Sequence, residues 1–231
     1  MSEPSNIAYV VACYFGDRRV NDYIYHNENR YDYIEWQIKQ LQLLKTTLVD
    51  KIIFVLSGCA EVPSDLNIPE RINNIPVDVL VRENIGLSYG AWNFAVNQYG
   101  HEFNYYFLIE DDYIPVMDFW DSAFMDRMAD NVAYVCTLFT DHVAVSYGLF
   151  RTSAILKTGG VKHASNSEYG SNETAGQIQW GQNLQSHGWK IVDVAKEYNI
   201  PFLNYLNAIV DCGKIGGSKI LSPVYCERMQ T

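Results

Sequence analysis

Residues 105–112 read Tyr-Tyr-Phe-Leu-Ile-Glu-Asp-Asp, an apolar run that ends in three adjacent carboxylates. The first five positions have the composition of a buried β-strand, so the acidic triplet stands where that strand should end. Adjacent carboxylates repel one another unless water or a cation neutralises them. In an extended chain Glu110 and Asp112 point to one side and Asp111 to the other. The stretch therefore predicts either a site for a hard divalent cation, which prefers oxygen ligands, or a solvated strand end.

On the N-terminal side of this stretch, apolar strands alternate with helical periodicity. Residues 7–15, 51–56 and 77–82 have the pattern of buried strands, and residues 31–48 and 89–99 that of helices, the second capped by Ser88. Such alternation predicts an α/β fold with a parallel sheet covered on both faces. Ligands of such sheets bind beyond the carboxyl ends of the strands, which is where the triplet lies.

The C-terminal side is less regular. We predict strands over 132–139, 143–150 and 189–194, and helices over 153–157 and 177–187. Residues 161–176 are rich in Ser, Asn and Gly and contain no clear periodicity. A connection of that length in a compact domain is typical of a binding loop or a lid.

Composition excludes several classes of function. The 231-residue chain has a formal net charge of −10, which argues against a broad nucleic-acid surface and against docking on anionic lipid. The five cysteines are odd in number, and no pair has Cys-x-x-Cys spacing, so we predict reduced thiols. The chain shows no signal peptide pattern and no apolar run long enough for a membrane span, which predicts a cytoplasmic protein. The glycosylation sequon at Asn172 is then accidental.

A second motif precedes the acidic strand. Residues 82–93 read Arg-Glu-Asn-Ile-Gly-Leu-Ser-Tyr-Gly-Ala-Trp-Asn, between a predicted strand and a predicted helix. Gly86 and Gly90 allow tight turns and the close approach of a ligand, and the helix start offers free N–H groups. Arg82 is placed to meet a phosphate or to form a surface ion pair. An ordinary capped helix is the alternative for the whole segment.

Together the two motifs resemble the GT-A glycosyltransferases. The family pattern is an Asn-x-Gly turn, a helix, and an apolar strand that ends in the acidic "DXD" motif; here these are residues 84–86, 90–93 and 110–112. Pro115 and Asp118-Phe119 add a similarity to the N-acetylglucosaminyltransferase branch. The resemblance covers roughly residues 7–194. It implies one GT-A (Rossmann-like) domain over residues 1–231, with a nucleotide-sugar-binding half at about 7–115 and a smaller, mixed acceptor-side half at about 116–231.

The resemblance also implies roles for single residues. Asp112, together with Glu110, would hold Mn²⁺ or Mg²⁺. Tyr14 or Phe15, at the end of the first strand, would stack on the nucleotide base, with core packing as the alternative for both rings. The remaining donor contacts would come from Arg82, Asn84, Gly90, Asn93, Glu110 and Asp111, and from Lys214 or Lys219 near the tail.

The chain departs from the family pattern at the general base. Inverting members carry an Asp or Glu near the start of the helix before a Gly-Trp stretch, and this residue takes the proton of the acceptor hydroxyl. Gly176 and Gln177 occupy that place here. Glu173 and Glu168 are the nearest carboxylates and the candidate bases, with solvated loop residues as the alternative. Inversion and retention both stay open.

The predicted function is metal-dependent transfer of a sugar from a nucleoside diphosphate sugar to a hydroxyl of a glycan or other acceptor. The resemblance implies that the donor sugar is linked to UDP. One alternative is a non-catalytic protein that binds nucleotide sugars or carbohydrates on the same fold. Another is a sugar-phosphate nucleotidyltransferase, which needs a Gly-rich loop after the first strand. That loop, residues 13–19, contains one glycine.

Overall fold

The computed structural model describes residues 6–15, 32–46, 48–111, 113–115, 118–136, 145, 148–193 and 203–205. Asp112, Lys214 and Lys219 lie outside the described residues. No helix among the described residues is both long enough and apolar enough to cross a lipid bilayer.

The described strands form one eight-stranded sheet and one two-stranded sheet. In spatial order the large sheet contains β3 (Arg71–Ile72), β4 (Ile75–Arg82), β2 (Val49–Ser57), β1 (Ile7–Tyr14), β5 (Tyr105–Glu110), β8 (Gly148–Arg151), β7 (Val132–Cys136) and β9 (Lys190–Asp193). β4, β2, β1 and β5 run parallel, as do β7 and β9, whereas β8 is antiparallel to both of its neighbours. The predicted α/β class and the mostly parallel sheet are confirmed.

The small sheet pairs two segments that are far apart in the sequence. β6 (Tyr113–Pro115) follows the acidic triplet directly and runs antiparallel to β10 (Leu203–Tyr205). The pairing places residues 203–205, which follow the last strand of the large sheet in the sequence, next to the segment that directly follows the acidic triplet.

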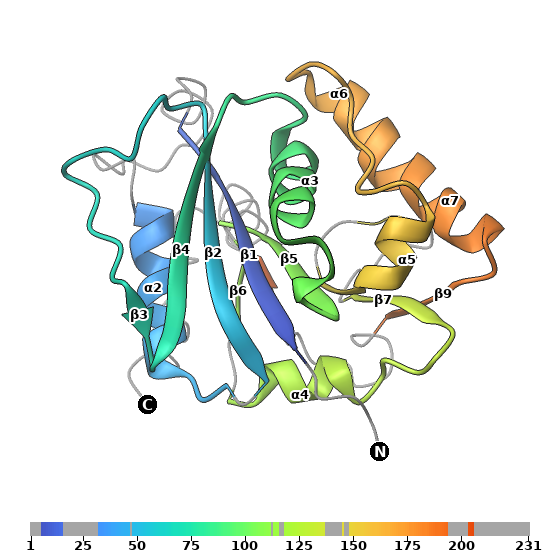
Figure 1. Cartoon of the computed structure of the whole chain (residues 1–231), viewed down its shortest axis with the longest axis horizontal. Helices are drawn as coiled ribbons and strands as arrows, with labels where there is room; N and C mark the ends of the chain where they lie inside the picture. Colours follow the sequence, from blue (N-terminus) through green and yellow to red (C-terminus); the bar gives the residue numbers. More distant parts are fainter. Residues whose placement is uncertain are drawn as a thin grey trace, which may run out of the picture.

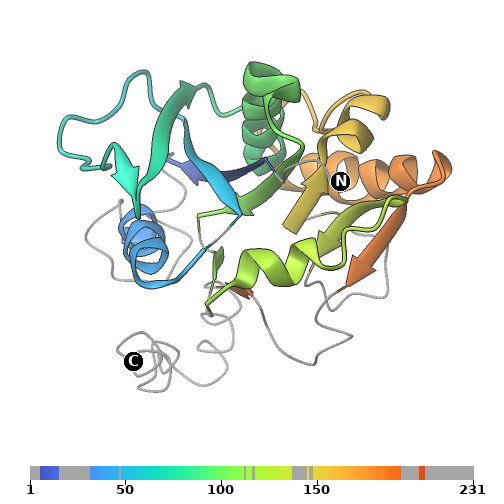
Figure 2. The ribbon, with the colours of Figure 1, turned by 60° about the horizontal axis from the view of Figure 1, so that its bottom comes forward.

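Helices cover both faces of the large sheet, as the sequence pattern predicts. On one face lie α3 (Leu87–Tyr99), α5 (Thr152–Lys157), α6 (Tyr169–Asn172), the π-helix η2 (Glu173–Gln179) and α7 (Trp180–Ser186). On the other lie α2 (Asp32–Leu43) and α4 (Trp120–Met125). Figures 1 and 2 show this division, with a short helix η1 (Gly100–Glu102) after α3.

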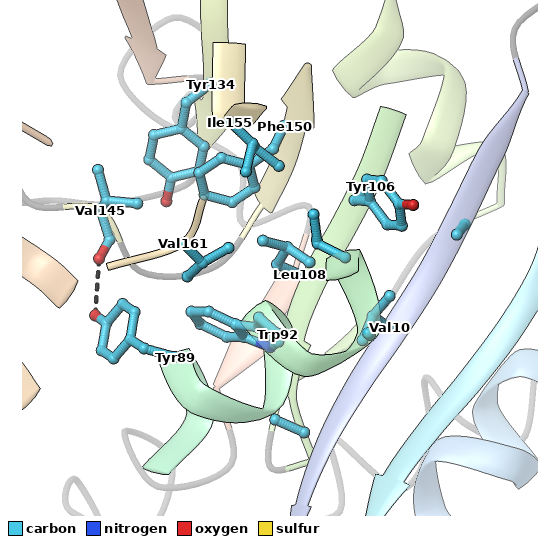
Figure 3. Packing of buried hydrophobic residues seen from close by; sticks show 14 of the residues in the cluster. Val10, Tyr89, Trp92, Tyr106, Leu108, Tyr134, Val145, Phe150, Ile155 and Val161 are labelled. Atoms are coloured by element: carbon cyan, nitrogen blue, oxygen red, sulfur yellow. Dashed lines mark hydrogen bonds between the residues drawn. The ribbon is translucent and has the colours of Figure 1, made fainter. Parts of the chain in front are cut away.

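Alternation along the central strands creates two separate cores. Tyr9 and Val11 of β1 pack with α2 and α4, whereas Ala8 and Val10 face α3. The second cluster includes an aromatic column in which Phe150 stacks on Tyr134 at 4.1 Å and on Trp180 at 4.9 Å between ring centroids. Figure 3 shows part of this cluster around Trp92. Strands buried on both faces explain why their sequences are continuous apolar runs.

One predicted helix ends earlier than its periodicity suggests. Residues 31–48 continue the apolar pattern, but α2 ends at Leu43. The Asn73 amide donates to the carbonyls of Leu41, Gln42 and Leu44 at 2.8, 3.2 and 3.3 Å and thereby satisfies the last turn. Asn73 stands in a two-residue hairpin turn between β3 and β4, with a positive φ of 49°, which Asn tolerates well.

Two other local predictions are wrong. Ser88 does not cap the second helix: α3 begins at Leu87 after Gly86, and the Ser88 hydroxyl donates to the Glu110 carboxylate, a charged acceptor that β5 brings within reach. Residues 161–176 are not one irregular loop, because helical structure begins at Tyr169 and continues to Ser186. Polar side chains from the start of this helical stretch, those of Ser171 and Asn172, form hydrogen bonds with residues 164–168.

Candidate functional site

The carboxyl ends of the parallel strands meet at one edge of the sheet. Strand register places Tyr14 of β1 beside Ser57 of β2, and Ser57 beside Arg82 of β4. Glu110, the last residue of β5, pairs with Ala12 of β1. The edge therefore carries a phenol ring, a hydroxyl, a guanidinium group and a carboxylate from four adjacent strands. This is the edge at which sheets of this class bind ligands.

The acidic triplet is divided between the two faces of the sheet. Glu110 is half-buried and accepts a hydrogen bond from the Ser88 hydroxyl, on the side of α3. Asp111 is 2% exposed, and its Oδ2 accepts from the Tyr14 N–H at 3.3 Å. The Asp111 N–H in turn donates to the Ala12 carbonyl at 3.1 Å. Asp111 thus joins the ends of β1 and β5.

Gln37 of α2 holds the end of β5 from the opposite face. Its side chain is fully buried, and its Nε2 donates to the carbonyls of Glu110 and Asp111 at 3.3 and 3.1 Å. Its Oε1 accepts from the Tyr9 hydroxyl at 3.1 Å. Burial, and then the Cys13 thiol, raise the pKa of Tyr9, which keeps that hydroxyl protonated as a donor. Sequence analysis missed Gln37, although a Gln between Ile34 and Ile38 on an apolar helix face is a signal for such a role.

The turn before α3 packs tightly against its own side chains. Arg82 is half-buried, and its guanidinium group donates to the Ser57 hydroxyl at 3.2 Å and to the Ile85 carbonyl. Burial lowers the pKa of Arg82, and the charge of Glu83 opposes that change. A Cβ added to Gly90 would lie 1.9 Å from the Ile85 oxygen. The close approach predicted at Gly90 is therefore that of the protein's own turn.

Residues 161–168 cover the other side of this turn. The Gly86 N–H donates to the Asn166 carbonyl at 2.8 Å, and the Ser167 hydroxyl donates to the Asn84 carbonyl. Asn93, in the second turn of α3, contacts His163 at 3.4 Å between Nδ2 and Nε2. The structure thus places the predicted donor-binding residues Asn84 and Asn93 against this segment of the chain.

One buried amide organises the covering segment. Asn172 is 1% exposed; its Oδ1 accepts from the Ala164 N–H, and its Nδ2 donates to the carbonyls of Asn166 and Glu168, each at 2.9 Å. An amide engaged on all sides in the interior has no access for a glycan. The sequon at this position therefore encodes a structural contact.

The two candidate bases have different environments. Glu168 is exposed, and its carboxylate accepts from the Ser171 hydroxyl at 3.1 Å, at the start of α6. Glu173 is half-buried at the start of η2. Burial, followed by the charges of Glu173 and Glu110, raises the pKa of Tyr169. Glu173 is therefore the less exposed of the two candidates, and it stands on the π-helix that packs against Tyr89 through Gly176.

The Tyr89 side chain of α3 is linked to η2 through Val145. Its ring is buried, its hydroxyl donates to the Val145 carbonyl at 2.8 Å, and the Val145 N–H donates to the Gln177 carbonyl at 2.9 Å. Burial, followed by the charges of Glu110, Tyr169 and Glu173, raises the pKa of Tyr89. Figure 3 shows the Tyr89 hydroxyl directed at Val145, away from Trp92. These contacts of Tyr89 fix η2, and with it Glu173, relative to α3.

The two aromatic residues at the end of β1 also differ. Phe15 packs against the core on the side of α2, and its N–H donates to the Ser57 carbonyl at 2.9 Å. Tyr14 is half-buried and follows the alternation of Ala12, which faces α3. Tyr14 therefore lies on the same side of the sheet as Glu110, where a planar base would be bound.

The donor set at this edge suits a hard cation. Glu110 offers carboxylate oxygens, and Ser88, which binds it, offers a hydroxyl oxygen. Oxygen is the ligand type that Mg²⁺ and Mn²⁺ prefer. Within the part of the chain that the structure describes, no group of three or more His, Cys, Asp or Glu side chains is arranged to hold a metal. Asp112, the other cation ligand that the sequence predicts, lies outside the described residues.

Comparison with known proteins gives matches to solved structures only. No family model and no curated protein sequence matches the chain. The chain is similar to a mannosyltransferase from Pyrobaculum calidifontis in complex with GDP-Man and Mn²⁺, with a TM-score of 0.57 at 12% sequence identity. That match covers 83% of this chain and 55% of the mannosyltransferase, so the chain spans about half the length of that protein.

A second match is the catalytic domain of Drosophila β1,4-galactosyltransferase 7 in complex with xylobiose, with a TM-score of 0.44 at 12% identity over 87% of this chain and 68% of that one. At such identities it is the arrangement of strands and helices that is shared. The eight-stranded, mostly parallel sheet and its match to the mannosyltransferase show that the chain has the GT-A-type glycosyltransferase fold, as the acidic strand end and the Asn84–Gly86 turn predicted.

Proposed function

We propose that this protein transfers a sugar from a nucleoside diphosphate sugar to a hydroxyl group of a glycan or other acceptor, and that it uses Mn²⁺ or Mg²⁺. The observation that carries the proposal is the carboxyl edge of the sheet, where Tyr14, Arg82 and Glu110 lie on neighbouring strands and the Ser88 hydroxyl binds Glu110. Glu173, on η2, supplies a further carboxylate, and Tyr89 links that helix to α3 through Val145. A polar donor edge with a carboxylate on a helix fixed beside α3 is suited to displacement at a sugar carbon.

The donor would be bound along the carboxyl edge. Tyr14 would stack on the base, and Arg82, which already reaches from β4 to Ser57 of β2, would attract a phosphate. Glu110 and Asp112 would hold the cation, which neutralises charge on the departing diphosphate. The mannosyltransferase of similar fold was determined with GDP-Man and Mn²⁺, which supports a metal–nucleotide site of this kind. We propose a UDP-linked donor, with GDP as the main competitor.

In the transfer step Glu173 would accept the proton of the acceptor hydroxyl. The freed oxygen would form a bond to the anomeric carbon as the bond from that carbon to the diphosphate oxygen breaks. Glu173 is half-buried at the start of a helix that is fixed against α3, a position from which its carboxylate would meet an acceptor hydroxyl. Tyr89 and Gly176, which fix η2, would hold this carboxylate in place.

Thermal unfolding with Mn²⁺ and a panel of nucleoside diphosphates tests the donor site. A ligand that binds only the folded protein, at 100 times its Kd, stabilises by about 2.7 kcal/mol. For a chain of this size that corresponds to a rise in Tm of roughly 5–10 °C. We expect this rise with Mn²⁺ plus UDP, little change with either alone, and loss of the rise in Asp112→Asn.

Glu70→Gln is the matched control, because it removes an exposed carboxylate near the start of β4, at the opposite edge of the sheet. It should respond as the parent does. An Asp112→Asn protein that responds like the parent would refute the metal assignment. Stabilisation by metal and nucleotide without any transfer to a panel of acceptor sugars would instead identify a binding protein on this fold.

A further inference from the structure

An exposed aromatic ring stands one helical turn before Glu173. Tyr169 is 69% exposed, the highest value among the large hydrophobic side chains that the structure describes. A ring this exposed offers a flat apolar face to the solvent and a hydroxyl at its tip, the combination that makes Tyr common at binding surfaces. Tyr169 is therefore a candidate ligand contact.

The backbone that carries Tyr169 is held firmly. Tyr169 is the first residue of α6, directly after the segment whose Asn166 carbonyl and Ser167 hydroxyl bind the turn before α3. Three residues later the buried Asn172 amide binds the same segment. α6 also packs against α3, and Figure 1 shows the two helices side by side near the start of α3. The ring is thus exposed on a rigid support, which lowers the entropy lost when a ligand binds.

The ring shares its helix face with the candidate base. Tyr169 and Glu173 are four residues apart, the spacing that places two side chains next to each other on a helix. Partial burial, followed by the charges of Glu173 and Glu110, raises the pKa of Tyr169, so the phenol is neutral at pH 7. A neutral phenol therefore shares a helix face with the Glu173 carboxylate, with most of its ring open to solvent.

We propose that Tyr169 is the platform of the acceptor site and that its ring stacks on a neutral pyranose, one of whose hydroxyls is then directed at Glu173. This inference rests on the proposed transfer function and names its acceptor class. A pyranose has an apolar face of C–H groups and a rim of hydroxyls, which match an aromatic face and the carboxylate acceptor of Glu173. The Glu173 carboxylate would also repel an acidic sugar, so the site selects against uronic acids.

Saturation-transfer NMR with methyl pyranosides tests this directly, because it detects binding without turnover. The probes are methyl glucoside, methyl galactoside and methyl mannoside, with methyl glucuronoside as the anionic comparison, in the presence of Mn²⁺ and UDP. We expect Tyr169→Ala to weaken binding of the neutral sugars roughly tenfold, the effect of truncating an aromatic anchor. Tyr169→Phe keeps the ring and should retain most of the binding.

Ile178→Ala is the matched control, since Ile178 is another exposed apolar side chain, 42% exposed, on η2. It should bind the pyranosides as the parent does. Equal binding by Tyr169→Ala and the parent would overturn the inference, as would a parent that binds no neutral pyranoside or prefers the glucuronoside.

Thermal unfolding of the same variants separates this inference from the proposed function. Tyr169→Ala should keep the full rise in Tm with Mn²⁺ and UDP, because the ring is not a donor contact. If the parent itself shows no rise with any nucleoside diphosphate, the proposed function fails, and the acceptor assignment that depends on it fails too.

Discussion

Glu110, Asp111 and Glu173 show how position changes the role of a carboxylate. Asp111 is buried against the ends of β1 and β5, where it accepts a backbone N–H. Glu110 is turned to the opposite face, where the Ser88 hydroxyl binds it, and Glu173 is half-buried at the start of η2. A carboxylate engaged by backbone N–H groups stabilises the fold, whereas a half-buried one beside a binding edge is suited to take part in chemistry.

At this scale the candidate bases can be compared by one substitution each. In Glu173→Gln the amide cannot accept a proton, so we expect kcat for sugar transfer to fall by roughly 10²–10³-fold, the usual contribution of a general base. Donor-dependent stabilisation with Mn²⁺ should persist. Steady-state transfer assays and thermal unfolding on the same preparation measure both effects.

Glu168→Gln is the comparison. A neutral amide oxygen can still accept the hydrogen bond from the Ser171 hydroxyl, so we expect at most a few-fold change in kcat, within the effect of one exposed contact. Equal kcat values for the two variants would remove Glu173 as the base.

Among the elements, the continuous helical stretch from Tyr169 to Ser186 does most to shape the site. Its middle is a π-helix. This conformation is rare in proteins overall, but where it occurs it is often at a functional site. Gly176 lies there against the buried Tyr89 ring: an added Cβ would be 2.3–2.5 Å from the ring carbons. The absence of a side chain at Gly176 allows η2 to approach α3 and brings Glu173 toward β5.

Alanine at two glycines of this stretch should have opposite effects. Gly176→Ala must displace either η2 or the Tyr89 ring, so we expect a loss of about 1–3 kcal/mol in the free energy of unfolding, the usual cost of overpacking. Gly170→Ala meets no atom within 4 Å. Because Ala favours helix, that variant should be unchanged or up to about 1 kcal/mol more stable.

Urea denaturation of both variants provides the measurement, and sugar transfer provides a second one. Gly176→Ala should also lose transfer activity, since Glu173 moves with η2. A Gly176→Ala protein as stable and active as Gly170→Ala would contradict the packing of Tyr89 described above.

For the molecule as a whole, the pairing of β2 with β4 links stability to pH. Asp78 of β4 accepts hydrogen bonds from Lys51 of β2 at 2.7 Å and from the Tyr99 hydroxyl at the end of α3 at 2.5 Å. Partial burial acts to raise the pKa of Asp78, but the hydrogen bonds from Lys51 and Tyr99 outweigh it, and the pKa is lowered. The contacts tie β2, β4 and the end of α3 together.

The sign of the pH dependence follows from this lowered pKa. The unfolded carboxyl titrates near 3.9, so the contribution of Asp78 is fully present above that pH and is lost as pH falls through the lower pKa of the folded protein. Since the pair is partly open to solvent, we expect Asp78→Asn to cost about 1 kcal/mol at pH 7 and progressively less below pH 4. Urea denaturation over pH 3–7 measures the difference.

Asp130→Asn, at an exposed turn before β7, is the control and should follow the parent at each pH. A deficit in Asp78→Asn that stays constant down to pH 3 would show that its cause is packing and not charge.

The sequence predicted the repeating units of the fold with fair accuracy. β1, β2, β4, β5 and β7 lie within the predicted apolar runs or within three residues of them, because a strand buried on both faces must be apolar throughout. α3 also follows its periodicity, and α2 does so as far as Leu43. The start of α6 was missed, because the stabilising partners of Asn172 come from a neighbouring loop and leave no mark in local propensity.

What the sequence determined by itself is the α/β alternation and the location of an acidic strand end beside a glycine-containing turn, since both depend on residues that are adjacent in the chain. Tertiary structure alone decided that Gln37 anchors β5, that Asp111 faces the interior, and that Gly176 of η2 packs against Tyr89 of α3. The physical reason is that strand register and helix packing bring such groups together from segments up to 97 positions apart, and such pairings are set by the complementarity of buried surfaces and not by local sequence.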